Sequence, residues 1–204
     1  MSIKARSLAT CSSCKAKQEI DVYKSINAVT DPELKARVLS GEAFLWECPQ
    51  CGKSNLSSFE CLYHDPQQKF MVWLLPFGEP EGPEKDAIMR QTRAMGDYRL
   101  RIVENPGELI EKVLIFDAGL SDRCMELVKF VSLKEMPTVS NLHFFRVQDE
   151  SLVFSGVRGD RMESFGVGLN VYEDCEGILS RNSSLTVEAG FCRIGPDWVS
   201  SILA

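Results

Sequence analysis

Two short cysteine pairs constrain the fold of this chain more than any other feature of its sequence. Cys11 and Cys14 form the first pair, and Cys48 and Cys51 form the second, after an interval of thirty-three residues. A turn with two residues between its cysteines directs both sulfurs towards one centre, and two such turns complete a tetrahedral four-sulfur site. That donor set suits Zn²⁺. The sequence therefore predicts one structural zinc site at these four cysteines.

Two other chemistries use cysteines at the same spacing. In thioredoxin-like redox proteins the pair begins a helix, whose dipole lowers the thiol pKa, whereas residues 52–58 have a turn-forming composition. Four cysteine sulfurs also bind iron, and the second pair, with Pro49 and Gly52, resembles the electron carrier rubredoxin. The first pair departs from that pattern, because Lys15 follows it in place of glycine. Iron therefore stays open as the alternative metal.

The composition is that of an ordinary globular protein, with 44% hydrophobic and 25% charged residues among 204. The sequence has no run of about 18 apolar residues that would cross a membrane. Its first ten residues lack the hydrophobic core of a signal peptide. We therefore expect a cytoplasmic protein. Thiols stay reduced in the cytoplasm, which favours metal binding over disulfides at the paired cysteines.

The charge of the chain disfavours nucleic acid as a partner. Residues 1–76 carry nine basic and eight acidic side chains, for a net charge of +1. Residues 77–204 carry fourteen basic and twenty-one acidic side chains, for a net charge of −7. An acidic surface repels phosphate backbones, and a near-neutral one offers no basic footprint. The expected partner is another protein.

A segment rich in proline, glycine and glutamate, Leu75–Glu84, interrupts the chain and sustains neither a helix nor a strand ladder. We expect it to join a domain of residues 1–76 to a domain of residues 77–204. In the first domain, alternating or apolar segments predict strands, and Pro32 and Gly41 bound a short inserted helix. The expected strands are Glu19–Tyr23, Phe44–Glu47, Phe59–His64 and Phe70–Leu75, the last two forming a hairpin turned at residues 65–68.

The second domain begins with a predicted helical hairpin. Residues 105–108 have the pattern of a capping box, and the first helix is expected to end at Gly119. The second helix is expected to begin at residues 121–122 and to turn Met125, Val128 and Val131 inward. The remaining expected elements are strands at 142–147, 151–157 and 163–172 and a last helix from Gly195. The fold class is therefore α+β: a zinc-ribbon-like β unit with a helical insertion, followed by a helical hairpin and a small antiparallel sheet.

The two cysteine pairs, the long insertion between them and the strands after the second pair resemble the CpXC family. The stretch from Arg101 to Arg123 is also similar to the part of that family downstream of the cysteines. The resemblance covers residues 8–135, and it implies four metal-binding cysteines and no particular activity. Ser12 stands where the family pattern can have proline, which loosens the first turn without removing a ligand.

Other residues are better explained by structure than by chemistry. Cys61 and His64 have a spacing that can suit a metal, but residues three apart on a strand face opposite sides. The acidic residues 173–176 fit a solvated surface, because hard cations need several converging oxygens. The glycines at 156–159 and 166–168 lack the lysine and helix of a phosphate-binding loop. Three scattered thiols are expected to be buried: Cys124, Cys175 and Cys192.

The sequence contains no nucleophile–base motif, and its two histidines leave few acid–base schemes. We therefore predict a non-catalytic protein-interaction or regulatory module stabilised by zinc. Two alternatives stay open. One is an enzyme whose site is assembled in the C-terminal unit from residues distant in sequence, and the other is a rubredoxin-like iron electron carrier.

Overall fold

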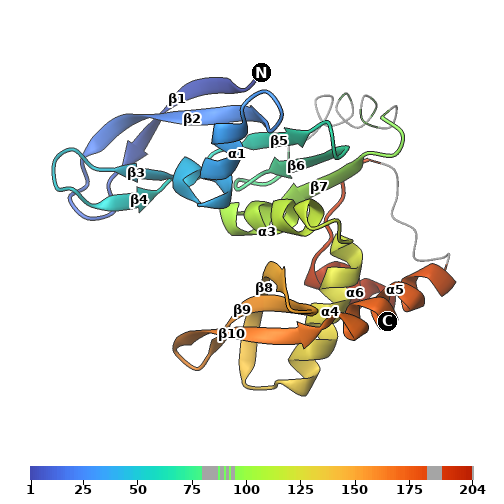
Figure 1. Cartoon of the computed structure of the whole chain (residues 1–204). Helices are drawn as coiled ribbons and strands as arrows, with labels where there is room; N and C mark the ends of the chain where they lie inside the picture. The colour runs from blue at the N-terminus through green and yellow to red at the C-terminus, as the bar shows by residue number, and fades with distance from the viewer. Residues whose placement is uncertain (80–86, 88–89, 91, 93–94, 183–189, 204) are drawn as a thin grey trace. The chain divides into compact units, whose positions relative to one another are not determined.

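The computed structural model describes residues 1–79, 87, 90, 92, 95–182 and 190–203. Within these residues the chain forms two compact units, Met1–Ile110 and Glu111–Ala204. Helices and sheets occur in both units (Figure 1), which confirms the predicted α+β class. No helix in the described part of the chain is long and apolar enough to span a bilayer.

The first unit is built on a mixed sheet that has five strands among the described residues, in the order β1-β2-β5-β6-β7. β1 pairs with β2, and β5 with β6, in antiparallel fashion. The β2–β5 and β6–β7 pairs are parallel. The strands are β1 (Ile3–Thr10), β2 (Lys17–Asn27), β5 (Cys61–Asp65), β6 (Phe70–Leu74) and β7 (Arg99–Val103).

The β5–β6 hairpin confirms the turn predicted at residues 65–68. The Asp65 carboxylate accepts a hydrogen bond from the backbone N–H of Gln68 at 3.1 Å, which is a contact that favours aspartate in turns. Along both strands alternate side chains are buried, and Tyr63 and Val72 are fully buried. These two strands therefore contribute buried apolar side chains to the core of the first unit.

The insertion between the cysteine pairs contains a helix, as predicted. α1 (Pro32–Leu39) has its proline in the first turn. It is followed by the 3-10 turn η1 (Glu42–Phe44). β3 (Leu45–Glu47) then pairs with β4 (Ser54–Leu56) as a separate two-stranded sheet. Residues 54–56 form a strand despite the turn-forming composition of residues 52–58, because pairing with β3 outweighs that local preference.

The sheet of the first unit continues beyond residue 76, where the sequence predicted a domain boundary. β7 lies at the edge of this sheet beside β6, and this strand was not predicted from the sequence. The segment Leu75–Glu84 is described only as far as Glu79, and residues 80–84 lie outside the described residues. That a unit packs compactly does not tell whether it folds independently. The division into domains 1–76 and 77–204 therefore stays a prediction.

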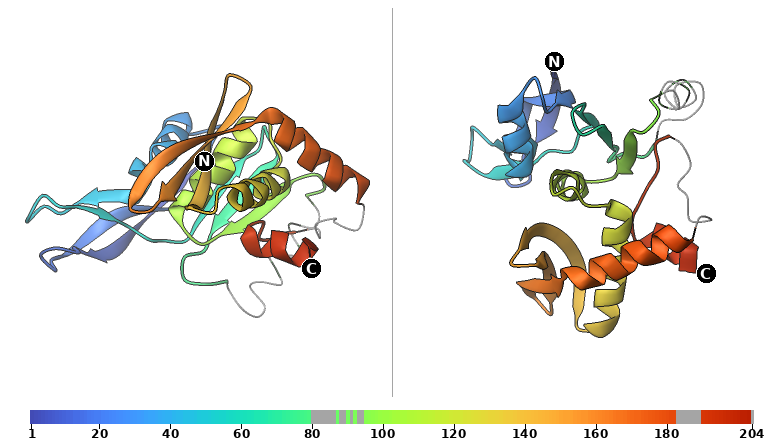
Figure 2. Two further views of the ribbon diagram at one scale, coloured as in Figure 1. Left: turned by 90° about the horizontal axis from the view of Figure 1, so that it is seen from below. Right: turned by 45° about the vertical axis from the view of Figure 1, so that its right-hand side comes forward.

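The second unit packs helices against a small antiparallel sheet, as predicted (Figure 2). The strand order is β10-β9-β8, and α4 contacts β8, α5 and α6. The elements are α3 (Pro106–Asp117), which crosses the division between the units, α4 (Asp122–Glu135), β8 (Val139–Gln148), β9 (Ser151–Arg158), β10 (Arg161–Gly168), α5 (Leu169–Arg181) and α6 (Pro196–Leu203).

The helical hairpin begins and turns as predicted. The Glu108 N–H donates to Asn105 Oδ1 at 3.0 Å, and Asn105 Nδ2 donates back to the Glu108 carboxylate at 2.7 Å. Asn105 therefore caps the helix as predicted. In place of the Asn105 backbone N–H of a full capping box, Glu108 accepts the Asn105 side-chain amide and, at 2.9 Å, the backbone N–H of Glu104. After α3, Gly119 adopts a left-handed conformation with φ 72°. Ser121 Oγ then caps α4 by accepting the N–H of Cys124 at 3.4 Å.

Two predictions for the second unit are wrong. Val131 is 42% exposed rather than inward, because the buried stripe that includes Met125 and Val128 continues to Ser132, one residue further on. The strand expected through residue 172 ends at Gly168, where α5 begins. Tyr172 and Cys175 lie three residues apart and are the buried residues of this helix, which is helical rather than strand spacing.

The helical hairpin buries five charged side chains in one continuous network. Lys129 Nζ lies 3.1 Å from the Glu111 carboxylate and 2.8 Å from that of Glu126. Lys112 Nζ lies 3.4 Å from Glu126 and 3.2 Å from Asp122. All five residues are buried. Each buried charge therefore has an opposite charge close enough to offset part of its desolvation cost.

Glu111 joins this network to β8, an edge strand of the small sheet. One carboxylate oxygen accepts the backbone N–H of Phe144 at 2.7 Å, and the other lies 3.2 Å from His143 Nδ1. Burial acts to raise the pKa of Glu111. The hydrogen bond from His143, the charge of Lys129 and the Phe144 N–H outweigh burial and lower that pKa to about 2. The Glu111 side chain therefore stays ionised inside the folded unit.

Candidate metal centre

The structure brings together the four cysteines that the sequence predicted as ligands. Their Sγ atoms all lie within 4.8 Å of one another. The Sγ–Sγ distance is 3.7 Å between Cys11 and Cys51 and 3.6 Å between Cys14 and Cys48. Four sulfurs bound at about 2.3 Å to one tetrahedral Zn²⁺ would lie about 3.8 Å apart. The separations of these free thiols therefore fit an ion of this size at their centre.

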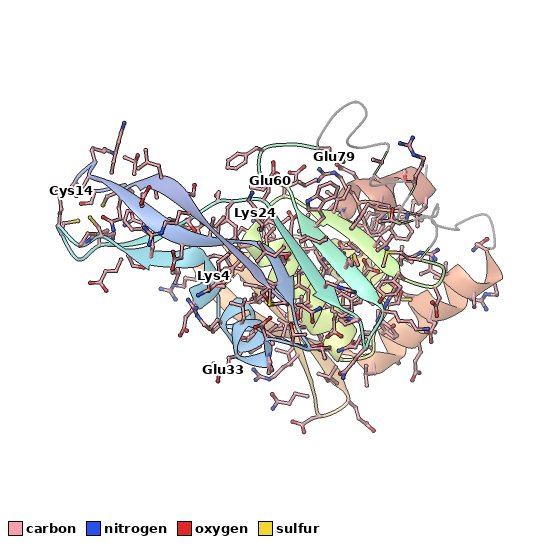
Figure 3. The ribbon with its side chains drawn as sticks, turned by 90° about the horizontal axis from the view of Figure 1, so that it is seen from above. Lys4, Cys14, Lys24, Glu33, Glu60 and Glu79 are labelled. Carbon is pink, nitrogen blue, oxygen red and sulfur yellow. The ribbon has the colours of Figure 1, made fainter. Side chains whose placement is uncertain are left out.

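Each cysteine pair lies in the turn of a β-hairpin. The first pair joins β1 to β2, and the second joins β3 to β4. Figure 3 shows Cys14 at the far end of these hairpins. The side chains of β1 and of the first half of β2 are mainly exposed. Little apolar packing therefore supports this end of the first unit.

The two turns share one pattern of backbone hydrogen bonds. In each, the N–H of the first cysteine donates to the carbonyl oxygen five residues later at 2.9 Å, from Cys11 to Ala16 and from Cys48 to Lys53. Such bonds close each turn and point its two sulfurs to the same side. Residues remote in sequence therefore form two equivalent halves of one site.

Lys15 and Gly52 occupy matching places in these turns. Each donates its N–H to the carbonyl of the first cysteine of its pair, at 3.1 Å for Lys15 and 2.8 Å for Gly52. Both are left-handed, with φ of 61° and 66°. Glycine adopts this conformation freely, whereas a residue with a Cβ adopts it at a cost of about 1 kcal/mol. Lysine in place of glycine at position 15 therefore makes the first turn less stable by this amount. The backbone conformation of the turn stays the same.

Asn55 of β4 contacts the cluster, and it was not singled out from the sequence. This buried side chain places Nδ2 3.7 Å from Cys11 Sγ and donates to the carbonyl of Lys53 at 2.7 Å. Its Oδ1 accepts the N–H and the hydroxyl of Ser12 at 2.8 and 2.9 Å. Pairing of β4 with β3 sets Asn55 opposite Trp46 and on the side of the cluster. Predicting from the sequence that the second cysteine pair lies in a hairpin turn would have pointed to Asn55.

The thiols of the first turn have pKa values shifted in opposite directions. The backbone N–H of Cys14 donates to the Cys11 sulfur, and together with the N–H of Ser13 and the nearby thiols it outweighs burial and lowers the pKa of Cys11 to about 6. The N–H of Ala16 favours the Cys14 thiolate. Burial and hydrogen bonds with the neighbouring thiols nevertheless raise the pKa of Cys14 to about 11. The Cys11 thiolate therefore forms readily, whereas the Cys14 thiolate needs a nearby cation.

The cluster is half buried. Cys11 and Cys48 are buried, whereas Cys14 and Cys51 are exposed. A metal bound by all four sulfurs has a complete tetrahedral shell, so it has no position for a water molecule or a substrate. Such a site stabilises the chain that surrounds it and does not act as a Lewis acid.

The other residues considered as ligands lie apart from this cluster. Cys61 and His64 face opposite sides of β5, as predicted, and burial raises the pKa of Cys61 to about 12. The three acidic residues of α5 considered as ligands, Glu173, Asp174 and Glu176, are exposed. The thiols of Cys124 and Cys175 are buried, as expected. Cys192 is partly exposed, so the expectation of burial is wrong there, because it precedes α6 rather than lying on an inward helical face.

Comparison with known proteins gives one match. A family model described as CpXC protein matches residues 9–129, which is more than half of the chain. No curated protein and no solved structure matches it. The matched region includes both cysteine turns, most of the five-stranded sheet and α3.

Proposed function

The chain belongs to the CpXC family, and we propose that its four clustered cysteines bind one structural Zn²⁺ ion. The observation that carries this proposal is the convergence of four Sγ atoms within 4.8 Å from two hairpin turns remote in sequence. Two such turns with an all-sulfur donor set are typical of a zinc ribbon. The ligands are Cys11, Cys14, Cys48 and Cys51.

Zinc would hold the two hairpins together where apolar packing is sparse. Structural zinc in small metal-dependent domains contributes on the order of 10 kcal/mol to folding, which exceeds what the exposed strands can supply. The thiolate ligands must stay reduced to bind it. We therefore propose that the protein resides in a reducing compartment, the cytoplasm.

We infer that the protein is an interaction or regulatory module with a protein partner. A closed four-sulfur shell supports a structural role for the metal rather than a catalytic one. The β3–β4 hairpin carries Leu45 and Leu56 directly opposite each other, 49% and 63% exposed. We propose this exposed apolar pair as part of the contact with the partner, since exposed apolar surface is what a protein partner would bury. The net charge of −7 in residues 77–204 disfavours a phosphate backbone.

Elemental analysis tests the metal. We expect the purified protein to be colourless and to contain about one zinc ion per chain. A strong chelator should remove it, and added zinc under reducing conditions should restore it. A coloured protein with one iron per chain would support the rubredoxin-like carrier instead, because ferric thiolates absorb visible light. Failure to bind either metal under reducing conditions would contradict the proposal.

Capture from native lysate tests the partner. We expect the full chain to retain a protein that a Leu56→Asp variant does not, because the new charge disrupts an apolar contact. Leu203→Asp is the matched control, since Leu203 is 54% exposed on α6, and it should retain the same protein. Zinc content should be normal in both variants. Bound material that is sensitive to nuclease rather than to protease would contradict a protein partner.

A further inference from the structure

The two cysteine turns differ in the residue after the first cysteine. In the second turn this residue is Pro49, whose ring fixes φ. In the first turn it is Ser12, which has no such restraint. Ser12 instead donates two hydrogen bonds to Asn55 Oδ1, from its N–H at 2.8 Å and from its hydroxyl at 2.9 Å. A proline at position 12 would lack both of these donors. In the first turn, the hydrogen bonds to Asn55 therefore supply the restraint that the proline ring supplies in the second.

Every hydrogen-bonding position of the Asn55 amide is occupied. Oδ1 accepts both bonds from Ser12, and one N–H of Nδ2 donates to the Lys53 carbonyl at 2.7 Å. The other N–H is left for Cys11 Sγ, 3.7 Å away. The Ser12 N–H can only donate and the Lys53 carbonyl can only accept, so turning the amide over would break both bonds. Its neighbours therefore fix the direction of the donor towards sulfur.

The Asn55 amide connects the two halves of the site. The Lys53 carbonyl that accepts from Asn55 also accepts the N–H of Cys48 at 2.9 Å. One side chain therefore contacts the sulfur of Cys11, the backbone of Ser12 and the carbonyl that closes the second turn. Asn55 is only 7% exposed, so water competes little for these bonds.

We propose that Asn55 is a positioning residue of the metal centre, an inference that rests on the zinc site proposed above. Asn55 holds the two cysteine turns in register and donates a hydrogen bond to the Cys11 thiolate. Groups that hydrogen-bond to metal ligands orient those ligands and tune the metal–ligand bond. Beside the sulfurs themselves, which meet across the two turns, the Asn55 side chain contacts both turns at once.

Three variants separate the parts of this role. Asn55→Leu has similar size and removes both donor and acceptor. Asn55→Asp keeps an acceptor for Ser12 and loses both donors, the one to Cys11 Sγ and the one to the Lys53 carbonyl. Ser12→Ala removes one bond to Asn55 and leaves the donor to Cys11 in place. Ser13→Ala is the control, because it is the same truncation one residue along and the Ser13 hydroxyl makes no hydrogen bond to the described residues.

The first measurement is zinc affinity, by competition with a chromophoric chelator. Asn55→Leu is expected to weaken zinc binding about 10- to 100-fold, as loss of a group supporting a ligand does. Ser12→Ala should weaken it about two- to tenfold, the effect of one hydrogen bond. Ser13→Ala should bind zinc as the unchanged protein does.

The second measurement is the thiolate-to-metal charge-transfer band of the Co²⁺-substituted protein. A thiolate that loses a hydrogen-bond donor gives up an electron more readily. The band should therefore move to lower energy in Asn55→Leu and Asn55→Asp. It should stay in place in Ser12→Ala, although binding is weaker there. A purely structural role for Asn55 would weaken binding and leave the band unmoved.

The outcomes separate this inference from the proposed zinc site. If the unchanged protein binds neither zinc nor cobalt, the zinc site itself is wrong. If it binds both and Asn55→Leu matches it in affinity and band position, only the role of Asn55 is overturned. Weaker binding with an unmoved band overturns the donor to sulfur. Should Asn55→Leu fail to fold, Asn55→Asp and Ser12→Ala decide by the same two measurements.

Discussion

A Cys48→Ser substitution is expected to abolish zinc binding and to disorder both hairpin turns. A serine hydroxyl is a poor substitute for a thiolate, and three sulfurs leave the tetrahedral shell incomplete. The loss amounts to a contribution on the order of 10 kcal/mol. Since β1 and the first half of β2 bury little surface, no other interaction there replaces it. Elemental analysis should find no bound zinc, and hydrogen exchange should accelerate at residues 8–19 and 45–57.

The disorder should stop short of the core of the five-stranded sheet. Tyr63 and Val72 are fully buried and neither belongs to the cysteine cluster, so amides of β5 and β6 should keep their protection. Cys192→Ser is the matched control, because it removes a thiol outside the cluster and should change neither zinc content nor exchange. A Cys48→Ser protein with full zinc occupancy would contradict the ligand assignment.

Glu111→Ala is expected to destabilise the second unit by about 3–5 kcal/mol, the cost of removing one partner from a buried ion pair. The change leaves Lys129 with Glu126 alone and leaves the Phe144 N–H without its acceptor. Denaturant unfolding followed by hydrogen exchange in α4 measures the effect. Glu135 is an exposed acidic residue at the end of α4. The control variant Glu135→Ala should therefore change the free energy of unfolding by less than about 0.5 kcal/mol.

The pH dependence of stability gives a second test of Glu111. Its pKa is lowered to about 2 in the folded protein, against about 4.3 in an unfolded chain. The unfolded state therefore takes up a proton first as pH falls. The stabilisation is fully present above about pH 4.3 and is lost as pH falls towards 2. Glu111→Ala should lose less stability across this interval than the unchanged protein does. Equal losses in the two proteins would show that Glu111 does not carry the acid sensitivity.

Local rules in the sequence predicted much of this fold. The Asn105 cap of α3 and the strand–turn–strand pattern of β5 and β6 depend on residues close in sequence, and both are confirmed. The convergence of the four cysteines was also predictable. Residues that bind the same metal ion must lie close together, however far apart they are in the sequence. Where neither local pattern nor ligand chemistry was available, the predictions were incomplete.

The features that were missed depend on tertiary partners. β7 joins the sheet only because β6 offers a parallel edge, and β4 is a strand only opposite β3. Glu111 and Lys112 were not singled out from the sequence, and it is their partners on α4 that allow these charged residues to be buried. Asn55 has no fixed spacing from Cys11, so only the folded hairpins bring the two together.

The placement of the cysteines at the far, sparsely packed end of two hairpins (Figure 3) has a consequence for the life of the protein in the cell. A newly made chain that has not yet acquired its ion would expose loose backbone at that end, and such segments are preferred by proteases. The lifetime of each molecule would then follow the local supply of metal, and degradation would remove the copies that were never loaded.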